Sequence, residues 1–374
     1  MDLSTLFLIA TGFGVVGIVL GAVGHPVLVF ALAQARRGTA AAIVVAGPLP
    51  RISVIVPVHA EARELRHKCL ALLAGEYPRD RLEILVAADG PVTDLDAALA
   101  SPVGEAVRLL RMPRRGKPDV LNGAVAQATG DLIVISDRDA VPEPDCLTNL
   151  VRVFADPSVG GACGHIGIAG KGSQRSYWAA ENHLRRAEVD ALGNLTSNSG
   201  ALTALRRNLW RDIPKDAADD LFIALTVFLH GRRFVFADAA RVTLPPRSQD
   251  LAGAVARQAR ITVQSLNTQW HCRAALDPFR SGWFAIALIC HKLLRRLFLF
   301  FVGFALFGAA GLTVIAGQGG AVALLALAAV VSLVVACLLP GVRLAKKGLW
   351  FVAAQAGMAL GVWRFLRGGR VNSW

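Results

Sequence analysis

The stretch Asp131-Leu-Ile-Val-Ile-Ser-Asp-Arg-Asp-Ala-Val141 decides the fold of this chain of 374 residues. Its apolar run, residues 132–135, is rich in β-branched side chains and is followed by two prolines, which predicts a short buried strand. Asp137 and Asp139 follow this strand. Ligands of open α/β sheets bind beyond the carboxyl ends of the strands, so the two carboxylates lie where a site is expected. We expect a turn after Ser136 that directs both toward one Mg²⁺ or Mn²⁺ ion, although a solvated loop is the simpler alternative.

The composition favours a globular part joined to membrane segments. Hydrophobic residues make up 54% of the chain and charged residues 18%, which is more apolar than a typical soluble domain. The formal net charge is +13, and the basic residues cluster beside the long apolar segments, which favours an anionic membrane face over nucleic acid. The six cysteines are scattered without a Cys-x-x-Cys motif, which is typical of a reduced cytosolic compartment and argues against structural zinc.

Apolar segments near both ends of the chain predict membrane helices. Residues 3–35 are almost uncharged and end at Arg36-Arg37, and because about twenty apolar residues cross a bilayer, this segment is expected to be an uncleaved anchor. The arginines after it place the N-terminus outside and the following residues in the cytoplasm. Toward the C-terminus, residues 297–315 and 321–339 predict a hairpin of two spans, and the shorter apolar segment 348–362 predicts a partly inserted or re-entrant helix.

Between these membrane segments the chain alternates strands and helices. A strand from Arg51 that is closed by Pro57, a helix over residues 61–73 and a strand over residues 82–87 form the first such unit. A helix after Gly116-Lys117 then leads into the strand at residues 132–135. This alternation predicts a parallel sheet with right-handed crossovers, so we expect a nucleotide-binding α/β half-domain. Farther on, we expect glycine-rich loops at 160–161 and 170–172, a helix over 177–191, a strand near 199–207, a helix from Asp216 through Val227, and a strand over 231–237.

Residues 249–276 predict a helix that mixes basic and apolar side chains just before the C-terminal spans. Such a helix is expected to lie in the membrane interface, or to cover the globular domain as an ordinary amphipathic helix. The expected domains are an N-terminal transmembrane anchor (1–37), a cytosolic α/β domain (50–248), amphipathic interface helices (249–296), and a C-terminal transmembrane hairpin with a short third membrane helix (297–374).

The motifs of the chain, taken in order, resemble those of the family 2 inverting glycosyltransferases, in particular the membrane-integrated branch that includes exopolysaccharide, cellulose and hyaluronan synthases. The resemblance covers roughly residues 51–296 and extends to the flanking spans. It implies an α/β fold of the GT-A type, with a Rossmann-like, mostly parallel sheet in the domain at 50–248, plus transmembrane α-helices. Its landmarks are Val-Ile-Val-Pro57-Val-His-Ala-Glu61, Asp89-Gly90, Arg115-Gly-Lys117 with Leu121-Asn122, Asp137-Arg-Asp139, Ser199-Gly200-Ala with Arg206-Arg207, Asp219-Asp220, and Arg257-Gln-Ala-Arg260.

The resemblance implies how a donor would be bound. Pro57, Glu61 and Asp89 would line the pocket for the uridine of a UDP-sugar, with Asp89 accepting a hydrogen bond from the base or ribose. Lys117 would approach the nucleotide, and Asn122 would brace the loop. Ordinary surface and helix packing is the alternative for these last two residues.

The resemblance also implies roles for four aspartates. Asp139 would bind the divalent cation, Mg²⁺ or Mn²⁺, and Asp137, a second candidate ligand, would face the sugar or ribose. A metal against the leaving diphosphate neutralises the charge that develops as the glycosidic C–O bond breaks. Inversion needs one base opposite the leaving group, which the resemblance places at Asp220, with Asp219 as the fallback. Capping of the following helix is the alternative for this pair.

Arg257 and Arg260 match the family's basic motif, whose side chains would contact the diphosphate. The tryptophan that follows this motif in the family is replaced by Ile261, which weakens the case for a long polymer. The resemblance implies a multi-pass inner-membrane enzyme whose cytoplasmic domain transfers sugar from a UDP-sugar to a lipid-linked or growing saccharide acceptor. The alternatives are a processive exopolysaccharide synthase, especially if copies assemble as a homo-oligomer, a polyprenyl-phosphate or ceramide glycosyltransferase, and a non-catalytic membrane scaffold.

Overall fold

The computed structural model describes residues 2–36, 48–170, 172–246, 250–317 and 343–369. The chain divides into two compact units. The first, which we call the helical unit, comprises Met1–Val27, Ser248–Leu266 and Ile286–Arg370. The second, the sheet unit, comprises Leu28–Arg247, Asn267–Ala285 and Val371–Trp374. The division into four segments expected from the sequence stays a prediction.

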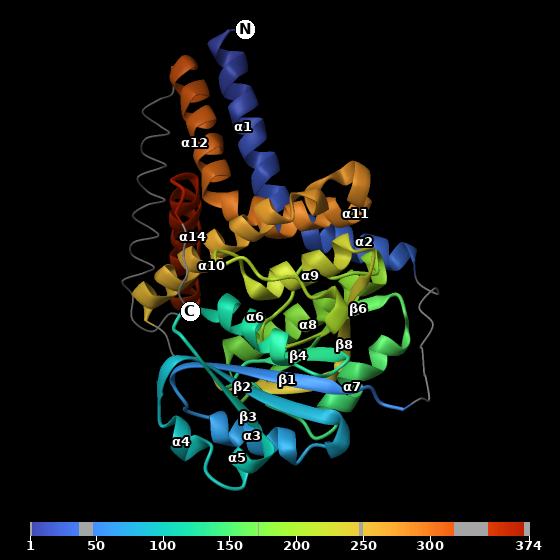
Figure 1. Ribbon diagram of the computed structural model, residues 1–374. Coiled ribbons are helices and arrows are strands. Elements are labelled where there is room, and N and C mark those ends of the chain that lie inside the picture. The colour runs from blue at the N-terminus through green and yellow to red at the C-terminus, as the bar shows by residue number, and fades with distance from the viewer. Residues whose placement is uncertain (1, 37–47, 171, 247–249, 318–342, 370–374) are drawn as a thin grey trace. The chain divides into compact units, whose positions relative to one another are not determined.

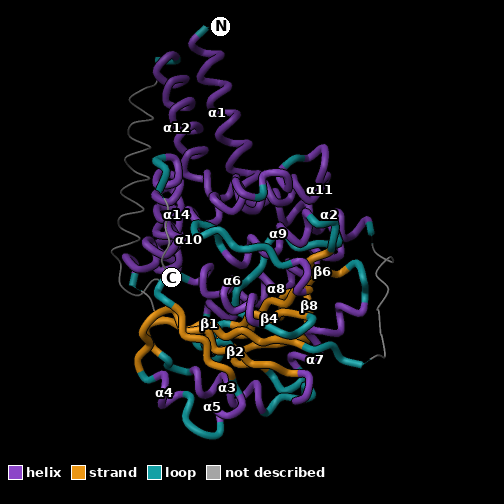
Figure 2. Tube along the Cα trace, in the orientation of Figure 1, coloured by secondary structure: helices purple, strands orange, loops and turns teal. Residues whose placement is uncertain are grey.

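The sheet unit is organised around an eight-stranded mixed sheet with the strand order β3-β2-β1-β4-β7-β6-β8-β5 (Figures 1 and 2). The strands β3, β2, β1 and β4 run parallel, whereas β7 is antiparallel to both of its neighbours. The expected α/β fold with a mostly parallel sheet is therefore confirmed. The strands are β1 (Ile52–Glu61), β2 (Leu82–Thr93), β3 (Arg108–Met112), β4 (Leu132–Ser136), β5 (Val141–Pro142), β6 (Val159–Ile168), β7 (Leu202–Arg206) and β8 (Arg233–Leu244).

Strand β1 is longer than its sequence predicted. It continues past Pro57 to Glu61, so the predicted end at Pro57 is wrong. Pro57 is tolerated because the last pair between β1 and β4 is Ile55 with Ile135, and beyond it β1 pairs with β2 alone among the described strands. The helix expected over residues 61–73 accordingly begins later, at Leu65.

Strand β6 occupies a segment whose glycines predicted a loop. Gly160 and Gly161 lie inside it, and Gly161 pairs with Leu205 of β7. A Cβ atom on Gly161 would lie 2.5 Å from the ring of Phe234 on β8, so the close approach of that ring requires glycine. The glycines therefore serve packing within the sheet, and the prediction of a loop was wrong at this position.

Helices cover both faces of the sheet (Figure 1). Right-handed crossovers place α3, between β1 and β2, opposite α6, which leads back to β4, because the two connections run in opposite directions along the sheet. The helices of this unit are α3 (Leu65–Leu73), α4 (Leu95–Ala98), α5 (Val103–Ala106), α6 (Lys117–Gln127), α7 (Cys146–Arg152), α8 (Ser173–Leu192), α9 (Asp219–Leu229) and α11 (Pro278–Leu288).

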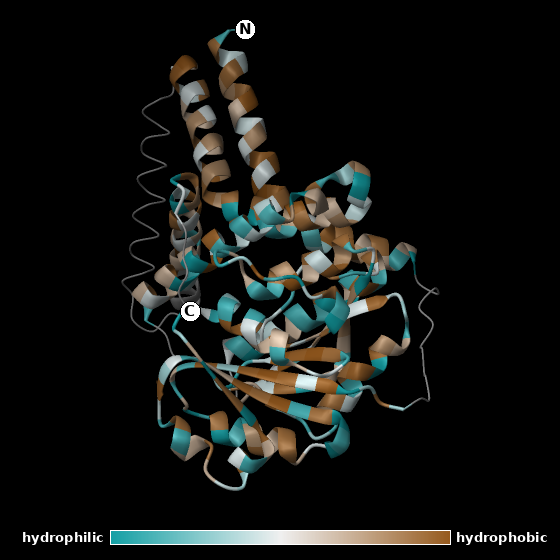
Figure 3. Cartoon of the chain, viewed as in Figure 1, coloured by the Kyte–Doolittle hydropathy of each residue, from teal (hydrophilic) through white to brown (hydrophobic). Residues whose placement is uncertain are grey.

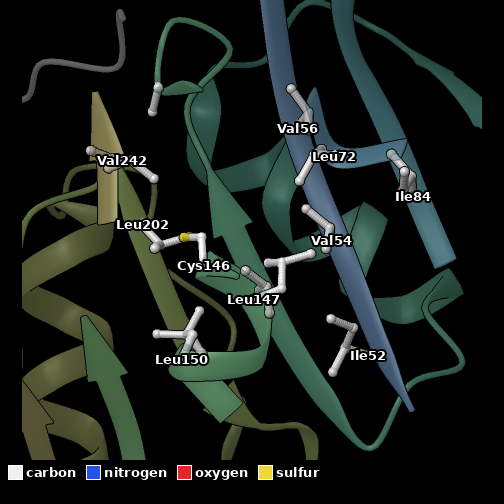
Figure 4. Close-up of a cluster of buried hydrophobic side chains, with 14 of the residues drawn as sticks. Ile52, Val54, Val56, Leu72, Ile84, Cys146, Leu147, Leu150, Leu202 and Val242 are labelled. Atoms are coloured by element: carbon white, nitrogen blue, oxygen red, sulfur yellow. The ribbon is translucent and has the colours of Figure 1, made fainter. Parts of the chain in front are cut away.

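The main core lies between the sheet and the helices α3 and α7 (Figure 4). Alternate residues of β1 point to this face, and fully burying each such aliphatic side chain contributes about 1.5–3 kcal/mol. The core thereby holds β1 and β4 side by side and fixes the edge where both strands end. Its labelled members are Ile52, Val54, Val56, Leu72, Ile84, Cys146, Leu147, Leu150, Leu202 and Val242.

The helical unit contains the most apolar helices of the chain. Figure 3 shows α1 and α12 as predominantly hydrophobic. The two helices pack together through aromatic rings: the ring centroids of Phe7 and Phe307 lie 5.5 Å apart, as do those of Phe13 and Phe301. Its helices are α1 (Leu3–Val19), α12 (Phe298–Ile315), α14 (Arg343–Leu366), the start of α2 (His25–Ala35), and α10 (Leu251–His271) as far as Leu266.

Three helical segments of the described chain are long and apolar enough to cross a membrane, namely Leu3–Ala35, Pro278–Ile315 and Gly348–Leu366. They indicate membrane association. The span expected at residues 321–339 lies outside the described residues. Residues 348–362 belong to the continuous helix α14, and their partial or re-entrant insertion stays a prediction.

Candidate active site

The turn that follows β4 is held at the edge of the sheet by its two neighbouring strands. Strand β4 ends at Ser136, as predicted, and the amide of Ala140 donates to the carbonyl of Asp137 at 3.1 Å. The guanidinium of Arg138 donates to the carbonyls of His59 and Glu61 at the end of β1. Because the chain places β2 and β4 on opposite sides of β1, the turn lies at a topological switch point, where α/β sheets bind ligands.

Lys117 joins two acidic side chains that come from different parts of the sheet unit. Its Nζ atom lies 3.0 Å from Asp137 Oδ1 and 3.0 Å from Asp219 Oδ2, and all three side chains are largely buried. Burial lowers the pKa of Lys117, but the two carboxylates outweigh it and raise the pKa above its usual value. The ammonium is therefore charged at neutral pH, and we call Lys117, Asp137 and Asp219 the charged cluster.

Gly200 lies against this charged cluster. A Cβ atom at this position would be 3.2 Å from Lys117 Nζ, 3.7 Å from Asp137 Oδ2 and 3.8 Å from Asp219 Oδ2. The antiparallel register of β4 and β7 explains the approach, because Ser136 pairs with Leu202 and the next residue, Asp137, donates to Ala201 at 3.3 Å. The sequence marked Gly200 as part of a motif, but its place beside both carboxylates follows only from this register.

Asp219 and Asp220 begin α9, but they do not act as its cap. The N-cap residue is Ala218, which makes no side-chain capping bond. Asp219 is directed to Lys117, and Asp220 Oδ1 accepts from the amide of Leu221 at 2.6 Å. Helix capping thus does not account for Asp219, although a carboxylate in the first turn still interacts favourably with the helix dipole.

The loop that presents Asp219 is braced at both of its ends. The side-chain amide of Asn122 forms two hydrogen bonds with the backbone of Ile213, at 3.1 and 2.9 Å. Near the other end, the amide of Ala218 donates to Thr268 Oγ1 at 2.8 Å, and Asp216 Oδ1 lies 2.9 Å from His271 Nε2. Asn122 therefore braces this loop, and its part in binding a nucleotide stays a prediction, whereas the contribution of α10 had no signal in the sequence.

The other residues expected to bind nucleotide lie around the same edge. Asp89 is 1% exposed, and its carboxylate accepts from the amides of Arg115, at 2.7 Å, and Gly116. It thereby fixes the turn that presents Lys117. Pro57 is buried within β1, and the exposed carboxylate of Glu61 lies 3.6 Å from Arg63. Their roles toward a nucleotide stay predictions.

Arg257 and Arg260 lie on the part of α10 that belongs to the helical unit. There Arg260 donates to Gln264 one turn later at 3.4 Å. The structure therefore brings Lys117, Asp137 and Asp219 together within the sheet unit, and it does not test whether the two arginines meet a diphosphate.

The acidic residues at this edge are the candidates for holding a divalent cation. Asp137 and Asp139 are half-buried on one turn, and Asp219 lies across Gly200 from Asp137. Carboxylate oxygens are the ligands that Mg²⁺ and Mn²⁺ prefer. In the structure the ammonium of Lys117 lies between Asp137 and Asp219, and metal binding by the acidic turn stays a prediction.

The mixed sheet with an acidic turn at its switch point has the architecture of the GT-A fold, and the comparisons with known proteins identify a glycosyltransferase. The model of glycosyl transferase family 2 matches residues 53–213, and the chain belongs to this family. A mannosyltransferase from Pyrobaculum calidifontis, solved in complex with GDP-Man and Mn²⁺, superposes with a TM-score of 0.67 at 25% identity, covering 95% of this chain and 99% of that chain.

The curated relatives include several proteins named N-acetylglucosaminyltransferase. The protein from Rhizobium leguminosarum bv. viciae is 27% identical over 217 residues, which are 52% of this chain and 50% of the relative. The protein from Bradyrhizobium elkanii is 30% identical over 125 residues, which are 32% of this chain and 67% of the relative. The chain spans about half the length of curated relatives such as the first. Together with the family match, these relatives identify the chain as a transferase enzyme.

Proposed function

We propose that this enzyme is a membrane-bound, inverting glycosyltransferase that moves a sugar from a UDP-sugar to a lipid-linked or growing saccharide acceptor. The observation that carries the proposal is the charged cluster of Lys117, Asp137 and Asp219 at the switch point, with Gly200 packed against it. Its single buried cation and surrounding carboxylates suit a sugar diphosphate bound together with a divalent metal.

Asp137 and Asp139 would hold that metal, Mg²⁺ or Mn²⁺, which when bound supplies Lewis-acid stabilisation of the leaving diphosphate. Lys117, paired with Asp137, would add a fixed positive charge near the leaving diphosphate. The neighbour from Pyrobaculum calidifontis, solved with GDP-Man and Mn²⁺, supports a metal and a nucleotide-sugar of this kind.

The base of the reaction is assigned to Asp220. In an inverting transfer the acceptor oxygen bonds to the anomeric carbon as the bond from that carbon to the diphosphate oxygen breaks, and one carboxylate takes the acceptor proton. Asp219 is the weaker choice because its carboxylate is engaged by the ammonium of Lys117 at 3.0 Å.

The acceptor and the location follow from the apolar helices. Three segments long and apolar enough to span a bilayer support an enzyme of the inner membrane with several passes, whose sheet unit works at the cytoplasmic face. An acceptor attached to a lipid, or a saccharide growing at that surface, would reach such a site.

The proposal is tested by incubating the full chain in detergent with Mn²⁺ or Mg²⁺ and a panel of UDP-sugars, with GDP-mannose included, and measuring release of the nucleoside diphosphate. We expect release from one UDP-sugar and its loss when EDTA is added. Asp139→Asn should need much more Mn²⁺ for half-maximal release. Asp238→Asn is the matched control, because this aspartate pairs with His165 and Arg186 away from the charged cluster. Release that ignores EDTA, or release from GDP-mannose alone, would contradict the proposal.

A further inference from the structure

Helix α3 carries a lysine on its buried face. Leu65, Cys69 and Leu72 form the side of the helix that packs into the core, and Lys68 lies on this same side. Its side chain is 0% exposed, which makes it the largest fully buried side chain of the described chain. The spacing of the apolar residues would predict leucine or methionine at this position.

The ammonium of Lys68 joins the two ends of the acidic turn. It donates to Ser136 Oγ at 2.6 Å and to the carbonyl of Ala140, the residues on either side of Asp137-Arg-Asp139. Ser136 Oγ in turn donates to the carbonyl of Ala201 at 2.8 Å, next to Gly200. One buried charge thus connects the backbone of the turn with the segment that leads to the charged cluster.

This arrangement costs stability, which points to a role beyond packing. Removing an ammonium from water costs several kcal/mol, and an apolar side chain of the same length would fill the space without that cost. Burial lowers the pKa of Lys68 to about 8, while the negative charge of the nearby Asp137 opposes this shift. The protonated form therefore prevails at neutral pH and can donate to both acceptors.

We propose that Lys68 is a positioning residue that holds the Asp137-Arg-Asp139 turn from inside the core in the geometry that binds the donor complex. Its effect on metal binding rests on the proposed function, whereas its effect on the turn itself does not. Lys117 touches the carboxylate of Asp137 on the site side, and Lys68 supports the backbone of the same turn from the core side. A purely space-filling Lys68 would affect stability but neither metal affinity nor the turn.

The first test is Lys68→Met, which keeps the length of the side chain and removes the ammonium. Binding of Mn²⁺ in the presence of UDP is followed by the loss of the free-ion signal in electron paramagnetic resonance. We expect at least about tenfold weaker Mn²⁺ binding, with a thermal midpoint equal to or above that of the wild type. Cys69→Ala is the control, because it opens the same helix face without touching the turn, and it should lower the thermal midpoint at wild-type Mn²⁺ affinity. Wild-type affinity in folded Lys68→Met would overturn the proposal.

The second test needs no donor. Hydrogen exchange of the amides at residues 137–140 should be faster in Lys68→Met than in the wild type or in Cys69→Ala, and unchanged exchange would refute the positioning role. If the wild type bound no Mn²⁺ with UDP, the proposed function would fail, and this exchange measurement would still decide the role of Lys68.

A third variant keeps the lysine. Ser136→Ala removes one acceptor and leaves the bond to Ala140, so it serves if Lys68→Met does not fold. It should weaken Mn²⁺ binding by about threefold and speed the same exchange, because one of the two supports of the turn is lost. Affinity and exchange equal to those of the wild type would contradict the proposal.

Discussion

The two halves of the sheet contribute different groups to the candidate active site. The parallel half, β3-β2-β1-β4, presents Lys117 and the turn with Asp137, and it anchors both through backbone contacts. The other half, β7-β6-β8-β5, brings Gly200 beside them, and the helix before β8 brings Asp219 and Asp220. The comparison teaches that the proposed work is divided: the parallel half would bind the diphosphate, whereas the carboxylates that would act on the acceptor come from α9, which follows the antiparallel strand β7. We expect variants of the first half to impair donor binding and variants of the second half to impair the chemical step.

The largest effect is expected for Asp220→Asn in the second half. The amide cannot take the proton of the acceptor, so kcat should fall by about 10³-fold while the dissociation constant of UDP with Mn²⁺ changes by less than about twofold. Steady-state kinetics and calorimetric titration of UDP provide the two values. Equal losses in kcat and UDP affinity would contradict the division of donor binding and chemical step between the two halves. Retained activity would place the base elsewhere.

Lys117→Met should show the opposite pattern. Loss of the buried cation leaves Asp137 and Asp219 facing each other and removes a partner for the diphosphate, so the KM for the donor should rise by about 30-fold, more than kcat falls. Lys215→Met is the control, since Lys215 is exposed and pairs with Asp119 at 3.3 Å. A loss confined to kcat would assign Lys117 to the chemical step.

Gly200→Ala tests the contact between the two halves of the sheet. The new methyl group would lie 3.2 Å from Lys117 Nζ, so the flexible ammonium must shift, and we expect about a tenfold loss in kcat/KM with little change in the thermal midpoint. The control is Gly167→Ala in β6, where the added Cβ atom would meet its nearest neighbours at 3.5 Å, an ordinary contact. Full activity of Gly200→Ala would mean that the cluster tolerates displacement.

Asn122→Ala removes the brace between α6 and the loop before α9. Two hydrogen bonds to Ile213 are lost, so the free energy of unfolding should fall by about 1–3 kcal/mol, and kcat by about threefold as Asp219 and Asp220 become less well placed. Asn149→Ala in α7 also removes hydrogen bonds but lies away from the site, and it should reduce stability without altering kcat. A loss of kcat in Asn122→Ala but not in Asn149→Ala would support a role of this loop in catalysis. Equal effects on kcat would contradict that role.

The smallest effect is expected in the pH dependence of stability. The pKa of Lys68 is about 8 in the folded chain and about 10.4 in an unfolded one, so between these values the unfolded state binds more protons and stability rises with pH. The cost of burying the charge is complete below pH 8 and absent above the unfolded pKa, a difference of about 3 kcal/mol. The difference in thermal midpoint between the wild type and Lys68→Met should therefore be smaller at pH 10 than at pH 7.5. A constant gap would show that the lysine does not lose its proton in this range.

Some of these features were readable in the sequence because they are local. The apolar run of β4 and the acidic pair after it predicted both the strand and the turn. In β6 the glycines predicted a loop that the structure does not have. A glycine that is needed because an aromatic ring of the next strand lies close cannot be distinguished, in the sequence, from a glycine in a loop.

The sequence by itself determined the α/β class, the position of the acidic turn and the segments apolar enough to cross a membrane, since these depend on the order and periodicity of neighbouring residues. The tertiary structure alone decided that Lys117 bridges Asp137 and Asp219, that Gly200 lies beside them, and that Lys68 supports the turn from the core. These contacts join residues far apart in the chain, and they depend on the register of β4 with β7 and on the packing of α3, which no local pattern encodes.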